Sequence, residues 1–229
     1  MSKSEARRQK QLAKKKGKRD AKRLEIARQH SDNPLIRLEG AEAWPILAAW
    51  APVEIAETRM GVVLLARHAR DGKIALASFL VDPYCLGVKD ADWNIISEWE
   101  YDRTLRKNQS VQALHKVAPE FLAKLVYGAV DYAQSIGFAP HPDYHHAKML
   151  LAGIDPSICM ETFTFGHDGK PLYINGPNDS LDRMKVIMHK VRLAGGHVAI
   201  GQGGGRMSPL ANDDGASEDE PSGAEILQS

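Results

Sequence analysis

The sequence is poor in cysteine. Its 229 residues include two, Cys85 and Cys159, and their separation fits neither a zinc motif nor a redox motif. This excludes a fold built on a disulfide framework, so we expect both to be free, buried thiols. The apolar fraction of 43% is ordinary for a globular protein, which predicts a domain that folds without metal or disulfide.

Long apolar runs are missing as well. No stretch approaches the roughly 18 consecutive apolar residues that cross a bilayer. No apolar segment follows the positive residues at the start, as a secretory signal would require. The sequence therefore predicts a cytoplasmic protein without a membrane partner.

Each end of the chain has little or no charge of one sign. Residues 1–30 contain twelve Lys or Arg against three acidic residues, a net charge of +9. After Arg206 there is no basic residue, and six acidic ones give that tail −6. The total of +1 thus hides a basic arm, a near-neutral body and an acidic tail. Such asymmetry indicates contact with a polyanion.

The basic arm favours nucleic acid as the partner, because neutralising phosphates releases condensed counterions. The arm contains no aromatic residue, so its binding should depend little on base sequence. RNA is favoured over DNA because Lys/Arg-rich arms often fold on RNA. The residues that we expect to contact phosphates are Arg7, Arg8, Lys10, Lys14, Lys15, Lys16, Lys18, Arg19, Lys22 and Arg23.

The chain divides into three regions by composition. Residues 1–33 are the basic arm, which we expect to be disordered, or helical on binding, because it has little apolar surface to bury. Asn33-Pro34 breaks any preceding helix and begins the globular domain, residues 34–194. Residues 195–229 are Gly-rich and then acidic, which predicts a disordered tail.

The central region predicts an α+β fold, one compact domain with two β-hairpins and about four helices. Each hairpin has two apolar runs around an Asp-Gly turn, with residues 84–88 expected to resume the second strand. The paired runs are 61–66 with 74–81, and 163–165 with 171–174. The expected helices are a short one within 35–52 with Pro45 in its first turn, then 119–136, 142–151 and 180–193.

Three carboxylates near the end of the first hairpin, Asp82, Asp90 and Asp92, are candidate metal ligands. Carboxylates at a strand end hold Mg²⁺ in many phosphodiester enzymes, since this hard ion prefers oxygen ligands. The simpler interpretation is a turn at Asp82-Pro83 and a cap by Asp90 and Asp92 for a helix over 94–106. We favour the turn and the cap, so no metal is expected.

The segment His141-Pro142-Asp143 is the second candidate site. His141 and His145 are four residues apart, as zinc-binding histidines on a helix are. However, no glutamate lies between them and no spacing identifies a third ligand. A helix cap at His141 with Asp143 in the first turn is therefore favoured.

Three uncommon strings occur in residues 79–91, 137–144 and 165–174. They read FLVDPYCLGVKDA, GFAPHPDY and FGHDGKPLYI, and they follow a Lys/Arg-rich start. In this the chain resembles a family of uncharacterised bacterial proteins, over about residues 60–180. The resemblance implies a bacterial cytoplasmic protein and carries no activity with it.

These observations lead to one main hypothesis and two alternatives. The main one is a cytoplasmic, nucleic-acid-associated protein, RNA-directed and anchored by its basic arm, with no cofactor. The first alternative is a metal-dependent hydrolase or nuclease using Asp82 and Asp90 with His141 and Asp143, for which Mg²⁺ would be the cofactor. The second is a protein-interaction module whose acidic tail shields the arm until a protein partner displaces it. The residues leave open whether the chain is an enzyme.

Overall fold

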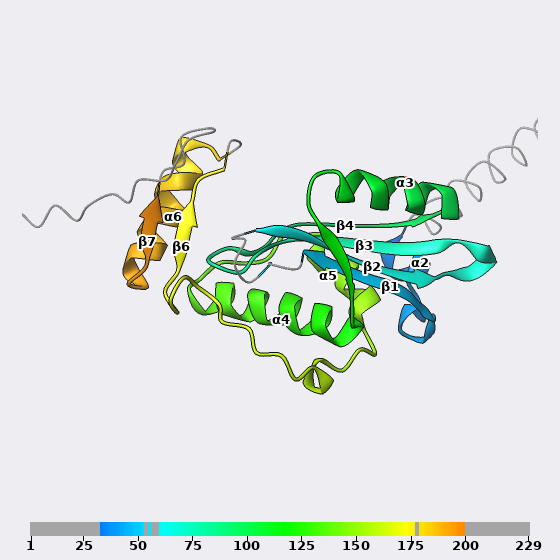
Figure 1. The fold of residues 1–229 in the computed structure, drawn as a ribbon. Helices are drawn as coiled ribbons and strands as arrows, with labels where there is room; N and C mark the ends of the chain where they lie inside the picture. The colour runs from blue at the N-terminus through cyan, green and yellow to red at the C-terminus, as the bar shows by residue number, and fades with distance from the viewer. Residues whose placement is uncertain (1–32, 53–54, 56–59, 177–178, 200–229) are drawn as a thin grey trace, which may run out of the picture.

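A five-stranded antiparallel sheet is the centre of the fold (Figure 1). The computed structural model describes residues 33–52, 55, 60–176 and 179–199. The strand order is β4-β3-β2-β1-β5. The strands are β1 Ile46–Pro52, β2 Gly61–His68, β3 Ile74–Asp82, β4 Gly87–Ile96 and β5 Leu114–Val117. The predicted α+β class is confirmed, whereas the basic arm and the acidic tail lie outside the described residues.

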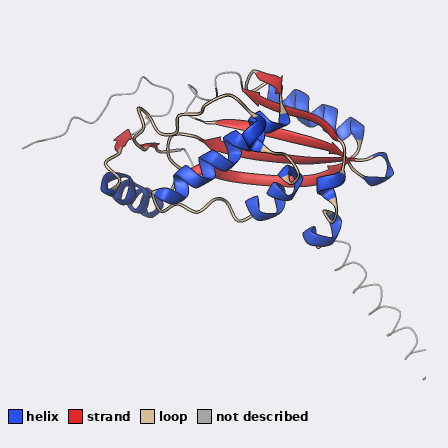
Figure 2. Cartoon of the chain, turned by 90° about the horizontal axis from the view of Figure 1, so that it is seen from below, coloured by secondary structure: helices blue, strands red, loops and turns tan. Residues whose placement is uncertain are grey.

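Helices cover both faces of this sheet. In Figure 1, α3 lies above the strands and α4 and α5 lie below them, and Figure 2 shows α4 crossing the strands. The helices are α2 Pro34–Arg37, α3 Glu98–Gln109, α4 Pro119–Ser135, α5 Tyr144–Ala147 and α6 Leu181–Leu193. Short 3₁₀ turns are Ala41–Ala43, Arg70–Gly72, Lys148–Leu151 and Pro156–Ile158. In the described part of the chain no helix is long and apolar enough to cross a membrane.

The continuous apolar runs of β2 and β3 follow from this two-sided cover. Val63, Leu65 and Phe79 are buried toward α4, whereas Leu64 and Leu76 are buried toward α3. The turn between the strands contains Asp71 and Gly72, both with φ in the left-handed region. Asp-Gly tolerates that conformation at little cost, so the first predicted hairpin is confirmed.

The helix expected within residues 35–52 is wrong. The helical part ends at Arg37, one 3₁₀ turn follows, and residues 46–52 form strand β1 between β2 and β5. Ala49 and Ala51 are buried on the α4 face, and Trp50 packs on the α3 face. The alanines suit a helix locally, but pairing with two strands outweighs that weak preference.

Residues 84–88 do not resume β3. The chain turns at Asp82, and β4 runs back antiparallel to β3, so Asp90 and Asp92 lie within a strand, opposite Leu80 and Ser78. The predicted cap by these two aspartates is therefore wrong. Instead, Ser97 caps α3 through a reciprocal capping box with Glu100.

The long helix at 119–135 and the last helix at 181–193 are confirmed. The helix expected over 142–151 is a four-residue α5 followed by a 3₁₀ turn. The second hairpin is reduced to one antiparallel bridge, His167 with Lys170. Strand β6, Leu172–Ile174, pairs in parallel with β7, His197–Ala199, through the crossover helix α6. Ordered structure thus passes the predicted domain end at residue 194.

A guanidinium lies inside the core. The Arg67 side chain on β2 is 2% exposed. It donates to four backbone carbonyls, those of Leu150 at 2.7 Å, Trp44 at 2.6 Å, Glu42 at 3.2 Å and Ala152 at 2.8 Å. Arg67 thereby joins the segment before β1 and the turn after α5 to the centre of the sheet.

Candidate nucleic-acid interface

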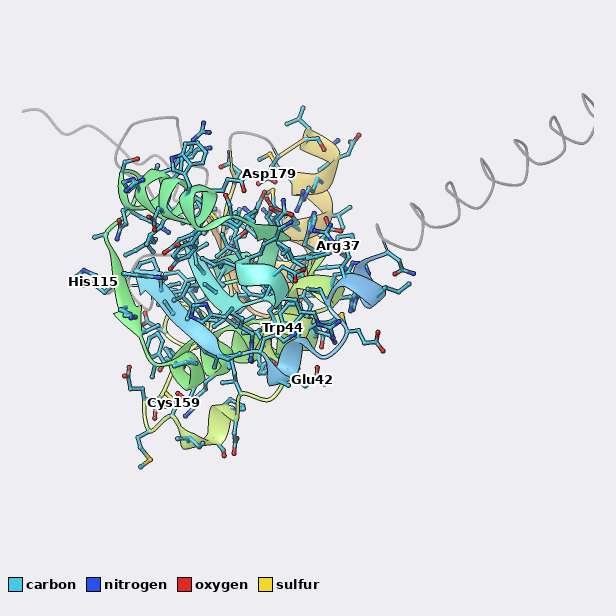
Figure 3. All side chains as sticks on the ribbon, turned by 90° about the vertical axis from the view of Figure 1, so that its right-hand side faces the viewer. Arg37, Glu42, Trp44, His115, Cys159 and Asp179 are labelled. Carbon is cyan, nitrogen blue, oxygen red and sulfur yellow. The ribbon has the colours of Figure 1, made fainter. Side chains whose placement is uncertain are left out.

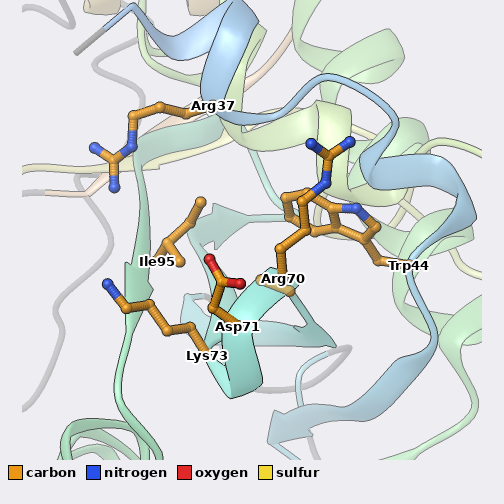
Figure 4. Close-up of a pocket in the computed structure, with 7 residues that line it drawn as sticks. Arg37, Trp44, Arg70, Asp71, Lys73 and Ile95 are labelled. Atoms are coloured by element: carbon orange, nitrogen blue, oxygen red, sulfur yellow. The ribbon is translucent and has the colours of Figure 1, made fainter. Parts of the chain in front are cut away.

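A cationic pocket lies at the end of the sheet that holds the β2–β3 turn. Its volume is about 260 Å³ (Figure 4). It is lined by Arg37, Trp44, Ala69, Arg70, Asp71, Lys73 and Ile95. Arg37 belongs to α2, the first described helix, which begins directly after residue 33. Arg37 is therefore close in sequence to the basic arm, which lies outside the described residues.

Several elements position these side chains. Arg37 is the last residue of α2, and its guanidinium lies 5.0 Å from the centroid of the Trp93 ring on β4. Arg70 and Lys73 flank the tight turn between β2 and β3. Trp44 is held through its carbonyl by the buried Arg67, at 2.6 Å. Three segments distant in sequence thus meet at one end of the sheet.

The pocket has an excess of positive charge. Arg37, Arg70 and Lys73 face one carboxylate, Asp71, so the lining carries a formal charge of +2. Among the described residues, none of the three cations forms an ion pair within 4.0 Å. In Figure 3, which views this end of the molecule, Arg37 and Trp44 lie on the same flank. Such a site suits an anion with apolar surface, as a nucleotide unit has.

Sequence reasoning missed these residues. Arg70 and Lys73 had a signal, since cations on both sides of a hairpin turn project from one tip. For Arg37 the only signal in the sequence was its closeness to the basic arm. That these cations meet over Ile95 depends on the register of β3 with β4, which no local pattern shows. The predicted phosphate contacts in residues 7–23 lie outside the described residues.

The predicted carboxylate cluster does not assemble around Asp82. This side chain is 8% exposed, and its Oδ1 accepts the backbone N–H groups of Tyr84 and Cys85, both at 3.1 Å. Burial raises the pKa of Asp82 to about 6, although Lys89 and these hydrogen bonds oppose the shift. Asp82 therefore shapes the turn after β3, whereas Asp90 and Asp92 are exposed on β4.

Asp90, His141 and Asp143 do come together. The imidazole Nε2 is 3.7 Å from Asp90 Oδ1, and Nδ1 is 3.7 Å from Asp143 Oδ2. The His141 backbone N–H donates to the Val88 carbonyl at 3.0 Å, which holds this loop on the edge of β4. His141 also lines a second pocket, of about 290 Å³, with Lys89 and Arg183.

Asp90 and Asp143 lie beside different nitrogens of the His141 ring, so their carboxylates do not converge on one point where an ion could bind. Within the described ranges no group of three or more His, Cys, Asp or Glu is arranged to hold a metal. Asp143, not His141, is the residue that precedes α5, and its side chain makes no cap bond. His145 is exposed and does not contact this cluster through any ion pair.

The cysteines differ in their surroundings. Cys85 is fully buried, and burial raises the pKa of its thiol, which keeps it protonated and unreactive. Cys159 is half-buried, so the expectation that both thiols are buried is wrong for it. Neither forms a disulfide.

No protein family, curated protein or solved structure matches this chain. The functional argument therefore depends on the geometry and charge of the sites described above.

Proposed function

We propose that this protein associates with nucleic acid, RNA in preference to DNA, in the bacterial cytoplasm. The observation that carries the proposal is the cationic pocket, in which Arg37, Arg70 and Lys73 form no ion pair with any residue that the structure describes. The arm supplies long-range attraction through a net charge of +9. The pocket adds contacts from side chains on helix α2 and the β2–β3 turn, whose backbone is already ordered, so little ordering entropy is lost on binding.

This arrangement makes binding strongly dependent on salt. Each phosphate that a Lys or Arg neutralises contributes about 0.7 to the salt slope for a single strand and about 0.9 for a duplex. The arm and the pocket therefore contribute separately measurable terms. Because the arm has no aromatic residue, its term should be the same for different base sequences.

Salt-dependent affinities of three proteins test the proposal. Fluorescence anisotropy with a labelled RNA hairpin and the same DNA sequence compares the full chain, a chain lacking residues 1–30, and the triple variant Arg37→Ala, Arg70→Ala, Lys73→Ala. The arm deletion should weaken binding to every sequence and flatten the salt slope. The triple variant should lower the slope by about 2 to 3, because it removes three phosphate contacts.

The matched control removes three exposed cations elsewhere, Lys116, Lys170 and Arg192, again as alanines. It should leave the slope within about 1 of the full chain, since distant charges make no phosphate contact. Equal affinity and slope for the arm deletion and the full chain would refute the role of the arm. Equal losses in the pocket and control variants would refute a site at the pocket.

The two alternatives are less well supported, although Asp90, His141 and Asp143 of the hydrolase hypothesis do lie together. A metal-dependent hydrolase needs Asp82 and Asp90 to share an ion, but Asp82 is buried and bound by the turn at its own strand end. The interaction module depends on the acidic tail, which lies outside the described residues and stays a hypothesis.

A further inference from the structure

The exposed face of α3 carries an aromatic ring and cations at helical spacing. Trp99, Arg103 and Arg106 fall at i, i+4 and i+7, within about 60° of one another around the helix. Trp99 is 63% exposed, whereas Tyr101 on the opposite side of the helix is buried. We call these three residues the α3 stripe. An indole this exposed is informative, because a ring of its size is usually well buried.

Helix α3, which carries the stripe, is held in two ways, by packing on the sheet and by hydrogen bonds at its first turn. Tyr101 and the half-buried Leu105 pack on the sheet, and the Trp50 indole N–H donates to the Tyr101 hydroxyl at 3.0 Å. At the first turn, the Glu100 carboxylate accepts from the Ser97 backbone N–H at 2.8 Å and its hydroxyl at 2.7 Å. Trp99 lies between these anchors, so its backbone is held in place before any ligand arrives.

Within the stripe, the Arg103 guanidinium lies 5.5 Å from the centroid of the Trp99 ring. An indole with a guanidinium beside it is a surface on which nucleic-acid bases stack, while the cation meets the adjoining phosphate. Lys107 borders the stripe, and the acidic Glu98 and Asp102 flank it on the other side. The charge of this face is therefore mixed, which makes stacking rather than net charge its main contribution.

The first turn of α3 and the cationic pocket lie at the same end of the sheet but on different faces, because Trp44 and Ile95 of the pocket pack on the α4 side. Helix α3 begins directly after β4, whose Ile96 pairs with Ile74, the residue next to Lys73 of the pocket. The pKa of Glu100 is lowered mainly by its hydrogen bonds with Ser97, and the positive charge of Lys73 lowers it further. The first turn of α3 and the β2–β3 turn, which carries Arg70 and Lys73, thus lie at the same end of the sheet (Figure 1).

We propose that the α3 stripe binds unpaired bases of single-stranded RNA, with Trp99 as the stacking residue and Arg103 and Arg106 on the phosphates. This inference rests on the proposed function and narrows it from RNA in general to single strands. In a duplex the faces of the bases are stacked on one another, so an exposed indole on a helix cannot reach them. A single strand offers both the bases and the flexible backbone that this stripe requires.

Affinities of Trp99→Ala, Trp99→Phe and Val111→Ala test the inference, measured by anisotropy on an oligouridine strand and on an RNA duplex of equal length. Val111 is the matched control, an apolar residue 83% exposed just beyond α3. Trp99→Ala should weaken single-strand binding by about 5- to 100-fold, the usual loss of one stacked base, and leave duplex binding unchanged. Trp99→Phe should retain most of the affinity, and Val111→Ala all of it.

The two proposals fail in different ways. If the full chain binds neither RNA, the proposed function is wrong. If it binds RNA through the arm and the cationic pocket, but Trp99→Ala binds the single strand as tightly as the full chain does, the inference about the stripe alone is wrong. An equal loss on strand and duplex would also overturn it, because that would indicate a phosphate or structural effect. Thermal unfolding of each variant verifies that the exposed substitutions leave the fold intact.

Discussion

Replacing Arg67 with methionine removes the donors of a buried guanidinium and keeps an unbranched side chain of similar length. The change leaves four backbone carbonyls without this partner, and the Leu150 carbonyl belongs to a fully buried residue. A hydrogen bond to a charged group contributes about 1.5–3 kcal/mol to stability. Four such bonds would exceed most of a domain's stability, so they must be offset by the cost of burying the charge.

The same burial acts on the pKa of Arg67. Desolvation lowers the pKa of the guanidinium, and the charge of Glu42 only partly opposes it. Each carbonyl left without its donor costs about 1–3 kcal/mol, and no longer burying the charge offsets part of that sum, so we expect a net loss of about 3–5 kcal/mol for Arg67→Met. Arg67→Lys should lose less stability than Arg67→Met but still be less stable than the natural chain, because an ammonium donates from one point and cannot reach carbonyls on several sides.

Urea and thermal unfolding followed by circular dichroism measure these losses. At about 2–4 °C per kcal/mol for a domain of this size, Arg67→Met should lower the Tm by about 6–20 °C. Arg70→Met is the matched control, since Arg70 is exposed three residues further on and should change the free energy of unfolding by less than about 0.5 kcal/mol. A loss below about 1 kcal/mol for Arg67→Met would refute the reasoning, because it would mean that the carbonyls find other partners.

Two further predictions concern the core and the turn after β3. Leu125 on α4 is 1% exposed, so Leu125→Ala should lower the free energy of unfolding by about 2–5 kcal/mol, and an unchanged Tm would contradict its place in the core. The raised pKa of Asp82, about 6 when folded against a usual 3.8, means that the folded state binds this proton more tightly, so its stabilising contribution is complete below pH 3.8 and is lost as the pH rises through 6. Asp82→Asn keeps an acceptor for the turn without the buried charge, so it should be more stable than the natural chain by about 3 kcal/mol at pH 7, with urea midpoints converging near pH 4. A difference that stays constant between pH 4 and 7 would show that the charge of Asp82 is not the cause.

Elements defined by neighbours in sequence could be predicted. The β2–β3 hairpin follows from two apolar runs and Asp71-Gly72, since a turn with φ in the left-handed region requires such residues. Helix α4 follows from Pro119 at its start and one apolar stripe. In both cases the energy that selects the structure lies within a few residues, so the pattern records it.

Elements defined by distant partners could not be predicted. Residues 46–52 are a strand because β2 and β5 lie on either side. The segment of β6 was expected as a strand, but its partner β7 lies across a helix and was missed. The candidate sites also divide into features set by neighbours in sequence and features set by distant segments. The charge of the basic arm is a property of the sequence alone, as its Lys and Arg are adjacent.

The pocket and the stripe belong to the tertiary structure. Arg37 meets Arg70 and Lys73 because α2 packs beside the β2–β3 turn, and Trp99 is exposed because Tyr101 is the residue that α3 buries. Helical spacing alone permits either aromatic residue to face the sheet, and packing against Trp50 selects Tyr101. The sequence by itself determined which segments carry charge and which apolar runs pair locally. Tertiary packing decided which of those side chains meet and which remain in water, because burial depends on surfaces that distant segments supply.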